Sequence, residues 1–327
     1  MIKIAVLGGS SFCGGAFLEH ALDCGLELMS FQRGEIGNQG WEIGIAPDRC
    51  SSLDINNSSS LREMVTKLRK FRPEVIVNFI SQGMVAPSWN APRDWYRTNL
   101  LGTSELIEAI SDLPSVQRFI HFSTPEVYGN TGPSPADESF GFNPSTPYAL
   151  SRAAAEQHLA LYQDKLPFDV VITRASNVYG LGQQLYRVIP NVFLCCQRGQ
   201  RFTLDGGGRS KRNFLHKTCM ARGILSVIES GISGEAYNLS GDRFISILEL
   251  VQLAVEIAGK KPADVIFESE ERLGKDSYYC LSNQKAIADL DWNPDVGLEQ
   301  GLALVHRWIQ SIADQITLDH AVYKHRP

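Results

Sequence analysis

The first half of the chain alternates short apolar runs with segments of helical periodicity. A run such as 75–80 carries apolar residues on both faces, which suits an interior strand of a parallel sheet covered by helices on both sides. Strand-like runs that alternate with helical segments predict repeated strand–helix–strand units, and therefore an open, doubly wound parallel α/β sheet. The strand-like runs are 3–7, 26–31, 75–80, 119–122 and 170–173, and the helical segments are 12–24, 61–71, 95–110 and 147–166.

After Arg174 this rhythm stops, and loops rich in Gly, Arg and Tyr separate the helical segments. The change predicts a smaller, irregular α+β region that binds substrate. Segment 234–239 reads as a further strand that returns to the first sheet. We expect a dinucleotide-binding domain of 1–173 plus about 214–242, and a substrate-binding domain of 174–213 and 243–327. The expected helices of the second half are 188–196, 220–230, 247–258 and 298–312.

Charge and hydropathy narrow the class of partner. The net charge of −5 argues against nucleic-acid binding, which needs a positive face, and favours a small-molecule partner. The apolar start of the chain meets glycines after a few residues, and no stretch reaches the roughly 18 apolar residues of a membrane span. We therefore expect a cytoplasmic protein without a membrane partner.

Cysteine and histidine spacing predicts neither a disulfide framework nor a metal site. The seven cysteines form no C-x-x-C pair, and an odd count leaves at least one of them unpaired. Reduced thiols in the cytoplasm fit this pattern. The seven histidines show no ligand spacing, so we expect no essential metal.

A glycine-rich turn follows the first predicted strand and opens the first predicted helix. In this context Gly8 permits a tight turn, the helix N-terminus meets a pyrophosphate, and Gly14 allows close helix–strand packing. The pattern predicts a Rossmann-type dinucleotide site, with Ser11 where a glycine is usual and its side chain able to crowd the cofactor. The expected contacts of this turn are Gly8, Ser10, Ser11, Phe12, Cys13 and Gly14.

The end of the second predicted strand bears on the choice of cofactor. An acidic residue is usual there for NAD, but this chain has Gln32 followed by Arg33. A neutral side chain beside a cation suits a 2′-phosphate, so we predict NADP in preference to NAD, although Glu35 could substitute for the missing acid. Asp54 and Ile55, at the expected end of the third strand, are predicted to bracket the adenine.

Six motifs in a fixed order identify a family resemblance, which covers residues 4 to about 308. The chain resembles the extended short-chain dehydrogenase/reductase family, specifically its nucleotide-sugar epimerases, dehydratases and decarboxylases. The resemblance implies an NAD(P)-dependent enzyme that oxidises the sugar of a nucleoside-diphosphate sugar at carbon 4, and it implies a homodimer formed through the helices near 95–110 and 147–166. The motifs lie at 77–82, 99–103, 123–129, 148–152, 174–180 and 212–216.

The resemblance assigns the catalytic pair to Thr124 and Tyr148. Oxidation of a hydroxyl group needs a base for its proton, and a tyrosine needs a nearby cation to ionise near neutral pH. The family places a lysine four residues after the tyrosine, whereas this chain has Arg152, which is permanently charged and has a larger fork that could engage ribose hydroxyls differently. Further cofactor contacts implied by the family are Phe79, Ile80, Ser81 and Asn99, together with Tyr148 and Arg152.

Glu126 points to a subclass. A carboxylate two residues after the catalytic hydroxyl resembles the dehydratases and decarboxylases, in which it handles a proton beside the transient ketone. Pro125, between Thr124 and Glu126, can donate no proton, so Glu126 or a water does both proton transfers, or the enzyme epimerises without elimination. A 4-epimerase, an NADP(H)-dependent ketone reductase and a catalytically silent nucleotide-sugar-binding protein remain alternatives.

The resemblance also implies which residues bind the substrate. Arginine forks suit the oxygens of the two substrate phosphates. The motif after 212–216 usually continues to an aspartate where this chain has Cys219, a difference that we attribute to local packing. The implied substrate-binding residues are Gln82, Ser88, Asn177, Arg187, Thr203, Arg212 and Arg272.

Overall fold

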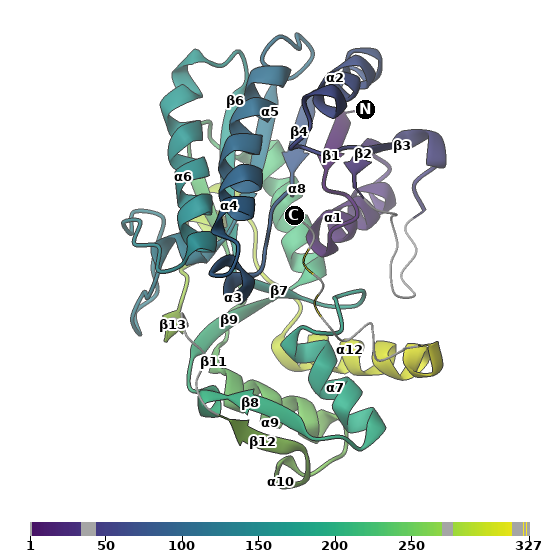
Figure 1. Ribbon diagram of the computed structural model, residues 1–327, viewed down its shortest axis with the longest axis vertical. Helices are drawn as coiled ribbons and strands as arrows, with labels where there is room; N and C mark the ends of the chain where they lie inside the picture. The colour runs from purple at the N-terminus through teal and green to yellow at the C-terminus, as the bar shows by residue number, and fades with distance from the viewer. Residues whose placement is uncertain (1, 34–43, 270–276, 316–322, 324, 326–327) are drawn as a thin grey trace.

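A seven-stranded sheet with strand order β10-β6-β5-β4-β1-β2-β3 forms the core of the upper, larger part of the molecule (Figure 1). The structure is a computed structural model that describes residues 2–33, 44–269, 277–315, 323 and 325. Every pairing along this order is parallel, which confirms the predicted doubly wound Rossmann-type sheet. The strands are β1 (Lys3–Leu7), β2 (Glu27–Gln32), β3 (Cys50–Ser52), β4 (Val75–Asn78), β5 (Arg118–Ser123), β6 (Asp169–Ala175) and β10 (Ala236–Leu239).

Alternate residues of the central strands bury opposite faces of the sheet. Ile4 and Val6 of β1 pack toward α1 (Phe12–Asp23) and α8 (Lys217–Ser230), whereas Ala5 and Leu7 pack toward the helices of the other face. These other helices are α2 (Ser58–Phe71), α5 (Gly102–Ile110) and α6 (Pro147–Tyr162). Helices on both faces explain why the strands are continuously apolar rather than alternating.

The second half of the chain forms a smaller region beside the carboxyl ends of the large sheet (Figure 1). One short sheet contains β7 (Asn177–Tyr179), β9 (Lys211–His216), β11 (Phe244–Ser246) and β13 (Tyr278–Tyr279), and a parallel pair joins β8 (Phe202–Asp205) to β12 (Ile266–Ser269). Helices α7 (Val188–Arg198), α9 (Ile247–Ile257) and α12 (Leu298–Ile312) share one apolar core with these strands. Between β9 and β11 the chain returns to the large sheet through α8 and β10, and β10 pairs with β6 as predicted for segment 234–239.

Two elements differ from the expected ones. Strand β3 ends at Ser52, because the Asp54 side chain accepts a hydrogen bond from Asn56 N at 3.0 Å and begins a turn. Asp54 and Ile55 therefore follow the strand rather than end it. The expected helix over 95–110 begins as α4 (Pro92–Trp95), widens into the π-helical turn η2 (Tyr96–Leu101) and continues as α5.

None of the helices within the described ranges combines the length and the apolar character needed to cross a membrane.

Candidate active site

The glycine-rich turn joins β1 to α1 at the carboxyl edge of the large sheet. Gly8 has a φ of +84°, and a Cβ there would lie 3.1 Å from the backbone of Phe79 and Ile80. A Cβ on Gly14 would lie 2.3 Å from the Gly8 carbonyl oxygen. Both positions thus require glycine for the reasons that the sequence indicated: a left-handed turn and a close approach of helix to strand.

The side chain of Ser11 caps α1. The Ser11 Oγ accepts a hydrogen bond from Gly14 N at 3.0 Å, in the arrangement of a helix N-cap. The neighbouring Cys13 thiol is a poor nucleophile, since burial raises its pKa to about 12 against the opposing charge of Arg187. Arg187 therefore lies within electrostatic range of this turn.

Gln32 and Arg33, at the end of β2, differ in their exposure to solvent. Gln32 is buried, and its Oε1 accepts a hydrogen bond from the Ser30 hydroxyl at 2.7 Å. Arg33 is exposed, so it is the side chain of this pair that reaches outward at the strand end. Glu35 lies outside the described residues.

Tyr148 lies at the centre of the predicted catalytic group. It is the second residue of α6, whose N-cap is Thr146. Thr124 is the N-cap of the 3-10 turn η3 (Pro125–Tyr128), which follows β5, and Glu126 lies within that turn. Tyr148, Thr124 and Glu126 are each 8% exposed. The sequence therefore brings the hydroxyl, the phenol and the carboxylate to one buried point.

The pKa of Tyr148 is raised, and several groups of the site contribute. Burial is the largest cause, and the Glu126 carboxylate raises it further. The Arg152 cation, a hydrogen bond with the Thr124 side chain and the Arg187 cation lower it in turn. These contributions place all four groups within interaction range of the phenol.

Arg152 is buried rather than solvated, with 1% of its surface exposed. One of its terminal nitrogens, Nη2, donates to the Phe122 carbonyl oxygen. Within the described part of the chain, its buried Nε and Nη1 have no hydrogen-bond partner. Unsatisfied buried donors are costly, so these two atoms are available to donate hydrogen bonds to a bound ligand.

Asn99 is placed by the π-helical turn η2 and ties three elements together. Its Oδ1 accepts from Gln82 N at 2.8 Å, and its Nδ2 donates to the Ser151 hydroxyl at 2.8 Å. Ser88, predicted as a substrate contact, accepts from Tyr148 N at 3.2 Å. Single π-helical turns are frequent at functional sites, and here the turn supports the N-terminal part of α6 through the bond from Asn99 to Ser151.

Of the other predicted contacts, Phe79 is buried, Ile80 half-buried and Ser81 exposed after β4. Arg212 on β9 lies 4.7 Å from the ring centroid of Tyr279, and its buried Nε has no hydrogen-bond partner among the residues that are described. Asn177 is half-buried at the start of β7, whereas Thr203 is exposed on β8. Arg272 lies outside the described residues.

Cys219 occupies the position where an aspartate is usual, and it keeps a polar role there. Its thiol lies 3.3 Å from Asp295 Oδ1 and accepts from Val296 N at 3.4 Å. The substitution is therefore absorbed by local packing of α8, as expected from the sequence.

Sequence reasoning missed contacts from two regions. Glu156 and Arg174 form a buried ion pair behind Tyr148, and the face shared by positions 148, 152 and 156 on one helix was the available signal. Near the C-terminus, the Tyr323 ring packs on Tyr186, and the His325 ring stacks on Trp95 with centroids 5.0 Å apart. No periodicity in the sequence predicts these terminal contacts.

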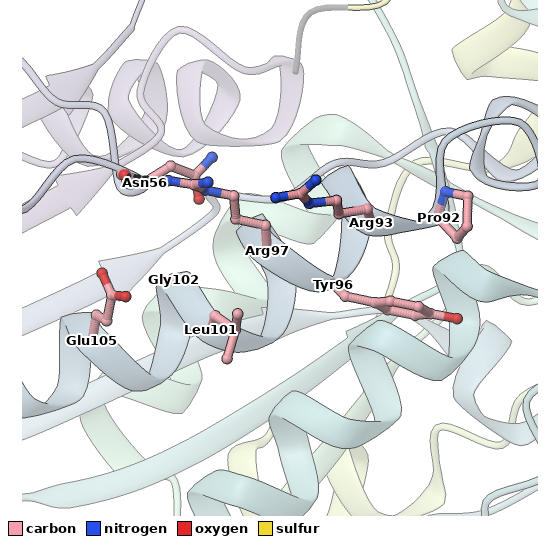
Figure 2. A pocket seen from close by; sticks show the side chains of 8 residues that line it. All are labelled: Asn56, Pro92, Arg93, Tyr96, Arg97, Leu101, Gly102 and Glu105. Atoms are coloured by element: carbon pink, nitrogen blue, oxygen red, sulfur yellow. Dashed lines mark hydrogen bonds between the residues drawn. The ribbon is translucent and has the colours of Figure 1, made fainter.

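A pocket of about 400 Å³ lies elsewhere, along the outer side of η2 and α5 (Figure 2). Arg93, Arg97 and Asn56 line it together with Tyr96, and Arg97 donates to the Asn56 carbonyl oxygen at 3.2 Å. None of the predicted catalytic side chains lines it, so its size says nothing about the chemistry at Tyr148.

A phenol held beside a cation, at the edge of a sheet that carries a dinucleotide-type turn, is the arrangement by which an enzyme exchanges hydride between a hydroxyl group and a dinucleotide. The class is therefore a dinucleotide-dependent enzyme. The family model described as the NAD dependent epimerase/dehydratase family matches residues 4–240, and the chain belongs to that family. The predicted relationship to extended short-chain dehydrogenases and the prediction of an enzyme are both confirmed.

Similarity to individual proteins agrees with this assignment. The chain is 32% identical over 240 residues to dTDP-D-glucose 4,6-dehydratase of Bos taurus, covering 72% of this chain and 67% of the relative. The structure of dTDP-glucose 4,6-dehydratase from Streptomyces venezuelae with NAD bound matches with a TM-score of 0.86 and 27% identity, over 95% of this chain and 97% of that one. UDP-glucose 4-epimerase of Thermus thermophilus, in complex with NAD, matches with a TM-score of 0.84 and 25% identity, over 94% and 99%.

Proposed function

We propose that this enzyme converts a nucleoside-diphosphate sugar by transient oxidation at carbon 4, followed by loss of water between carbons 5 and 6. The observation that carries the proposal is the buried Glu126 carboxylate, which interacts with the Tyr148 phenol across the same site. The similarity to dTDP-glucose 4,6-dehydratases supports it.

A panel of dTDP-, UDP-, GDP- and CDP-sugars tests the proposal. Each is incubated with the protein and either NAD or NADP, and the products are analysed by mass spectrometry. We expect one nucleotide sugar to lose one water and become a 4-keto-6-deoxy product, with no net change in nicotinamide absorbance. A steady loss of NADPH absorbance would instead identify a ketone reductase.

The proposed catalytic roles belong to Tyr148, Thr124 and Glu126. Tyr148 takes the proton of the carbon-4 hydroxyl, and Thr124 holds that hydroxyl through a hydrogen bond. A bound nicotinamide dinucleotide supplies the chemistry of accepting hydride and returning it. Glu126 takes the proton from carbon 5, which the neighbouring ketone makes acidic, and because Pro125 has no proton to give, Glu126 or a water delivers one to the departing hydroxyl.

Pro125 also favours a second candidate, 4-epimerisation without elimination. An epimerase needs no acid at that position, and the fold is shared with the Thermus thermophilus 4-epimerase. In the same panel this activity appears as a product of unchanged mass with an inverted carbon 4.

The substrate phosphates are proposed to lie between the two regions of the chain. We assign residues 174–213 and 243–327 to substrate binding and the remainder, 1–173 and about 214–242, to the dinucleotide. Arg212 offers a buried Nε for a phosphate oxygen, and Arg187 interacts electrostatically with both Cys13 and Tyr148. Bidentate guanidinium geometry suits phosphate.

NADP is the proposed cofactor, on the basis of the exposed Arg33 at the end of β2. Arg33→Ala should weaken NADP(H) binding about tenfold to hundredfold, the effect of losing one hydrogen bond to a charged group. Isothermal titration measures this, with NAD(H) affinity, which should not change, as the internal control. Tighter binding of NAD(H) than of NADP(H) by the parent protein would refute the preference.

A homodimer is proposed through η2 and α6. Leu101 is 56% exposed, and Leu150 and Leu161, which lie three turns apart on one side of α6, are 48% and 75% exposed. A second copy would cover these side chains. Leu150→Glu should therefore yield a monomer in sedimentation velocity, whereas Ile232→Glu, at an apolar residue that is 54% exposed after α8, should leave the dimer intact. A monomeric parent protein at micromolar concentration would contradict the proposal.

A cytoplasmic location is also proposed, because all seven cysteines are free in the structure, as thiols are in a reducing compartment.

A further inference from the structure

A buried carboxylate lies directly behind the catalytic residues. Glu156 is 1% exposed and follows Arg152 by one turn of α6 and Tyr148 by two turns, so the three share one face of the helix. The Glu156 Oε1 accepts from the Ser123 hydroxyl at the end of β5. The Glu156 Oε2 accepts from two nitrogens of Arg174, Nε at 2.9 Å and Nη2 at 2.6 Å.

Arg174 connects this carboxylate to the other catalytic segment. Its Nη1 donates to the Tyr128 hydroxyl at 2.6 Å, and Tyr128 in turn donates to Asn238 Oδ1 at 3.0 Å. Tyr128 is the last residue of η3, the turn that carries Glu126. The helix with Tyr148 and the turn with Glu126 are therefore anchored to the same ion pair.

Arg152 forms no hydrogen bond with Glu156, although the two lie on the same helix face. A carboxylate and a guanidinium four residues apart on a helix face are natural partners, and Arg152 does interact electrostatically with Glu156. Yet both Glu156 oxygens bond elsewhere, and Arg152 donates to the Phe122 carbonyl oxygen instead. Its Nε and Nη1 stay buried without a protein partner among the described residues.

We propose that Arg174 is a positioning residue: by occupying the Glu156 carboxylate, it keeps Arg152 from pairing with that carboxylate and leaves the Arg152 guanidinium available to the bound dinucleotide beside Tyr148. The inference rests on the proposed function for the role of Tyr148, but not for the competition between the two arginines. Removal of Arg174 leaves a buried, unpaired carboxylate, and Arg152, one helical turn away and already interacting electrostatically with Glu156, is a cation able to neutralise it.

The consequence for Tyr148 follows from the charges that face it. Glu126 raises the pKa of the phenol, whereas Arg152 and Arg187 lower it, together with the Thr124 hydrogen bond. On its other side, Arg152 faces His121, whose pKa is kept well below the usual value by burial and by the Arg152 charge. If Glu156 captures Arg152, the phenol loses part of its stabilising cation and ionises at higher pH.

Three variants separate this idea from a purely structural role: Arg174→Gln, Glu156→Gln and the double variant. In Arg174→Gln we expect the dissociation constant for NAD or NADP, measured by isothermal titration, to rise about tenfold to hundredfold. We also expect half-maximal turnover to move to higher pH. In the double variant no carboxylate competes for Arg152, so both quantities should return toward those of the parent protein, and Glu156→Gln alone should not move the pH midpoint upward.

Arg174→Lys keeps the charge and should preserve the parental affinity, which covers the case in which Arg174→Gln fails to fold. Arg118→Gln is the matched control, because Arg118 pairs with Asp169 at the opposite end of the same two strands, at 3.1 Å. It should lower stability without changing cofactor affinity or the pH midpoint.

The proposal is overturned if Arg174→Gln binds cofactor as the parent does, or if the double variant is weaker than the single one. Absence of turnover with every nucleotide sugar would refute the proposed function. The cofactor affinities of the Arg174 and Glu156 variants would still test whether Arg174 and Arg152 compete for the Glu156 carboxylate.

Discussion

Tyr148→Phe should lower sugar turnover by about 10²–10⁴-fold, the contribution of a positioned general base. The substitution removes the hydroxyl that we propose takes the substrate proton, and it leaves the ring near the start of α6 in place. Product formation with the active nucleotide sugar is the measurement. Parental turnover should rise with pH, because burial and Glu126 raise the pKa of the phenol and only its ionised form accepts a proton.

Tyr237→Phe is a matched control for this loss. Tyr237 is fully buried on β10, and its hydroxyl accepts from Ile232 N at 3.2 Å, away from the site. The control should keep parental turnover while losing some stability. If Tyr148→Phe turned over as fast as this control, the phenol would not be the base.

Glu126→Gln should reduce release of the 4-keto-6-deoxy product by about 10²–10⁴-fold while leaving oxidation at carbon 4 in place. Glutamine fills the same space but cannot take the carbon-5 proton. Two readouts separate the steps: reduced nicotinamide should appear on mixing with substrate, and deuterium from heavy water should no longer enter carbon 5.

Glu138→Gln controls for the loss of a carboxylate near the same strands. Glu138 is half-buried and accepts from Asn238 N at 2.6 Å, a bond that a glutamine oxygen preserves. This variant should form product at the parental rate. Parental rates in Glu126→Gln would mean that elimination, if it occurs, uses another base.

The large sheet was predictable because its strands are buried on both faces. Runs such as Val75–Asn78 need no knowledge of their neighbours to be recognised, and the parallel order follows from the helices between them. The two small sheets were not predicted strand by strand. Elements such as Tyr278–Tyr279 are too short to show a periodicity of their own and depend on pairing with distant partners.

The site was predictable where motif spacing sets geometry, as for Tyr148 and Arg152 on one helix face. It was not predictable where the outcome depends on competition between side chains. The direction of the Ser11 hydroxyl is decided by Gly14 N, and the partner of Glu156 is decided by Arg174 from another strand. Such choices depend on tertiary contacts that spacing along the chain does not contain.

The π-helical turn at Tyr96–Leu101 also constrains how this enzyme can be altered. Removing one residue would convert the wide turn into an ordinary α-helical turn, and the residues within it would then project in different directions. Asn99 lies inside the turn, so its side chain would lose the direction in which it now accepts a hydrogen bond from Gln82 N. A shortened, regular helix should therefore support α6 less well, so the irregular turn is a poor target for stabilising redesign.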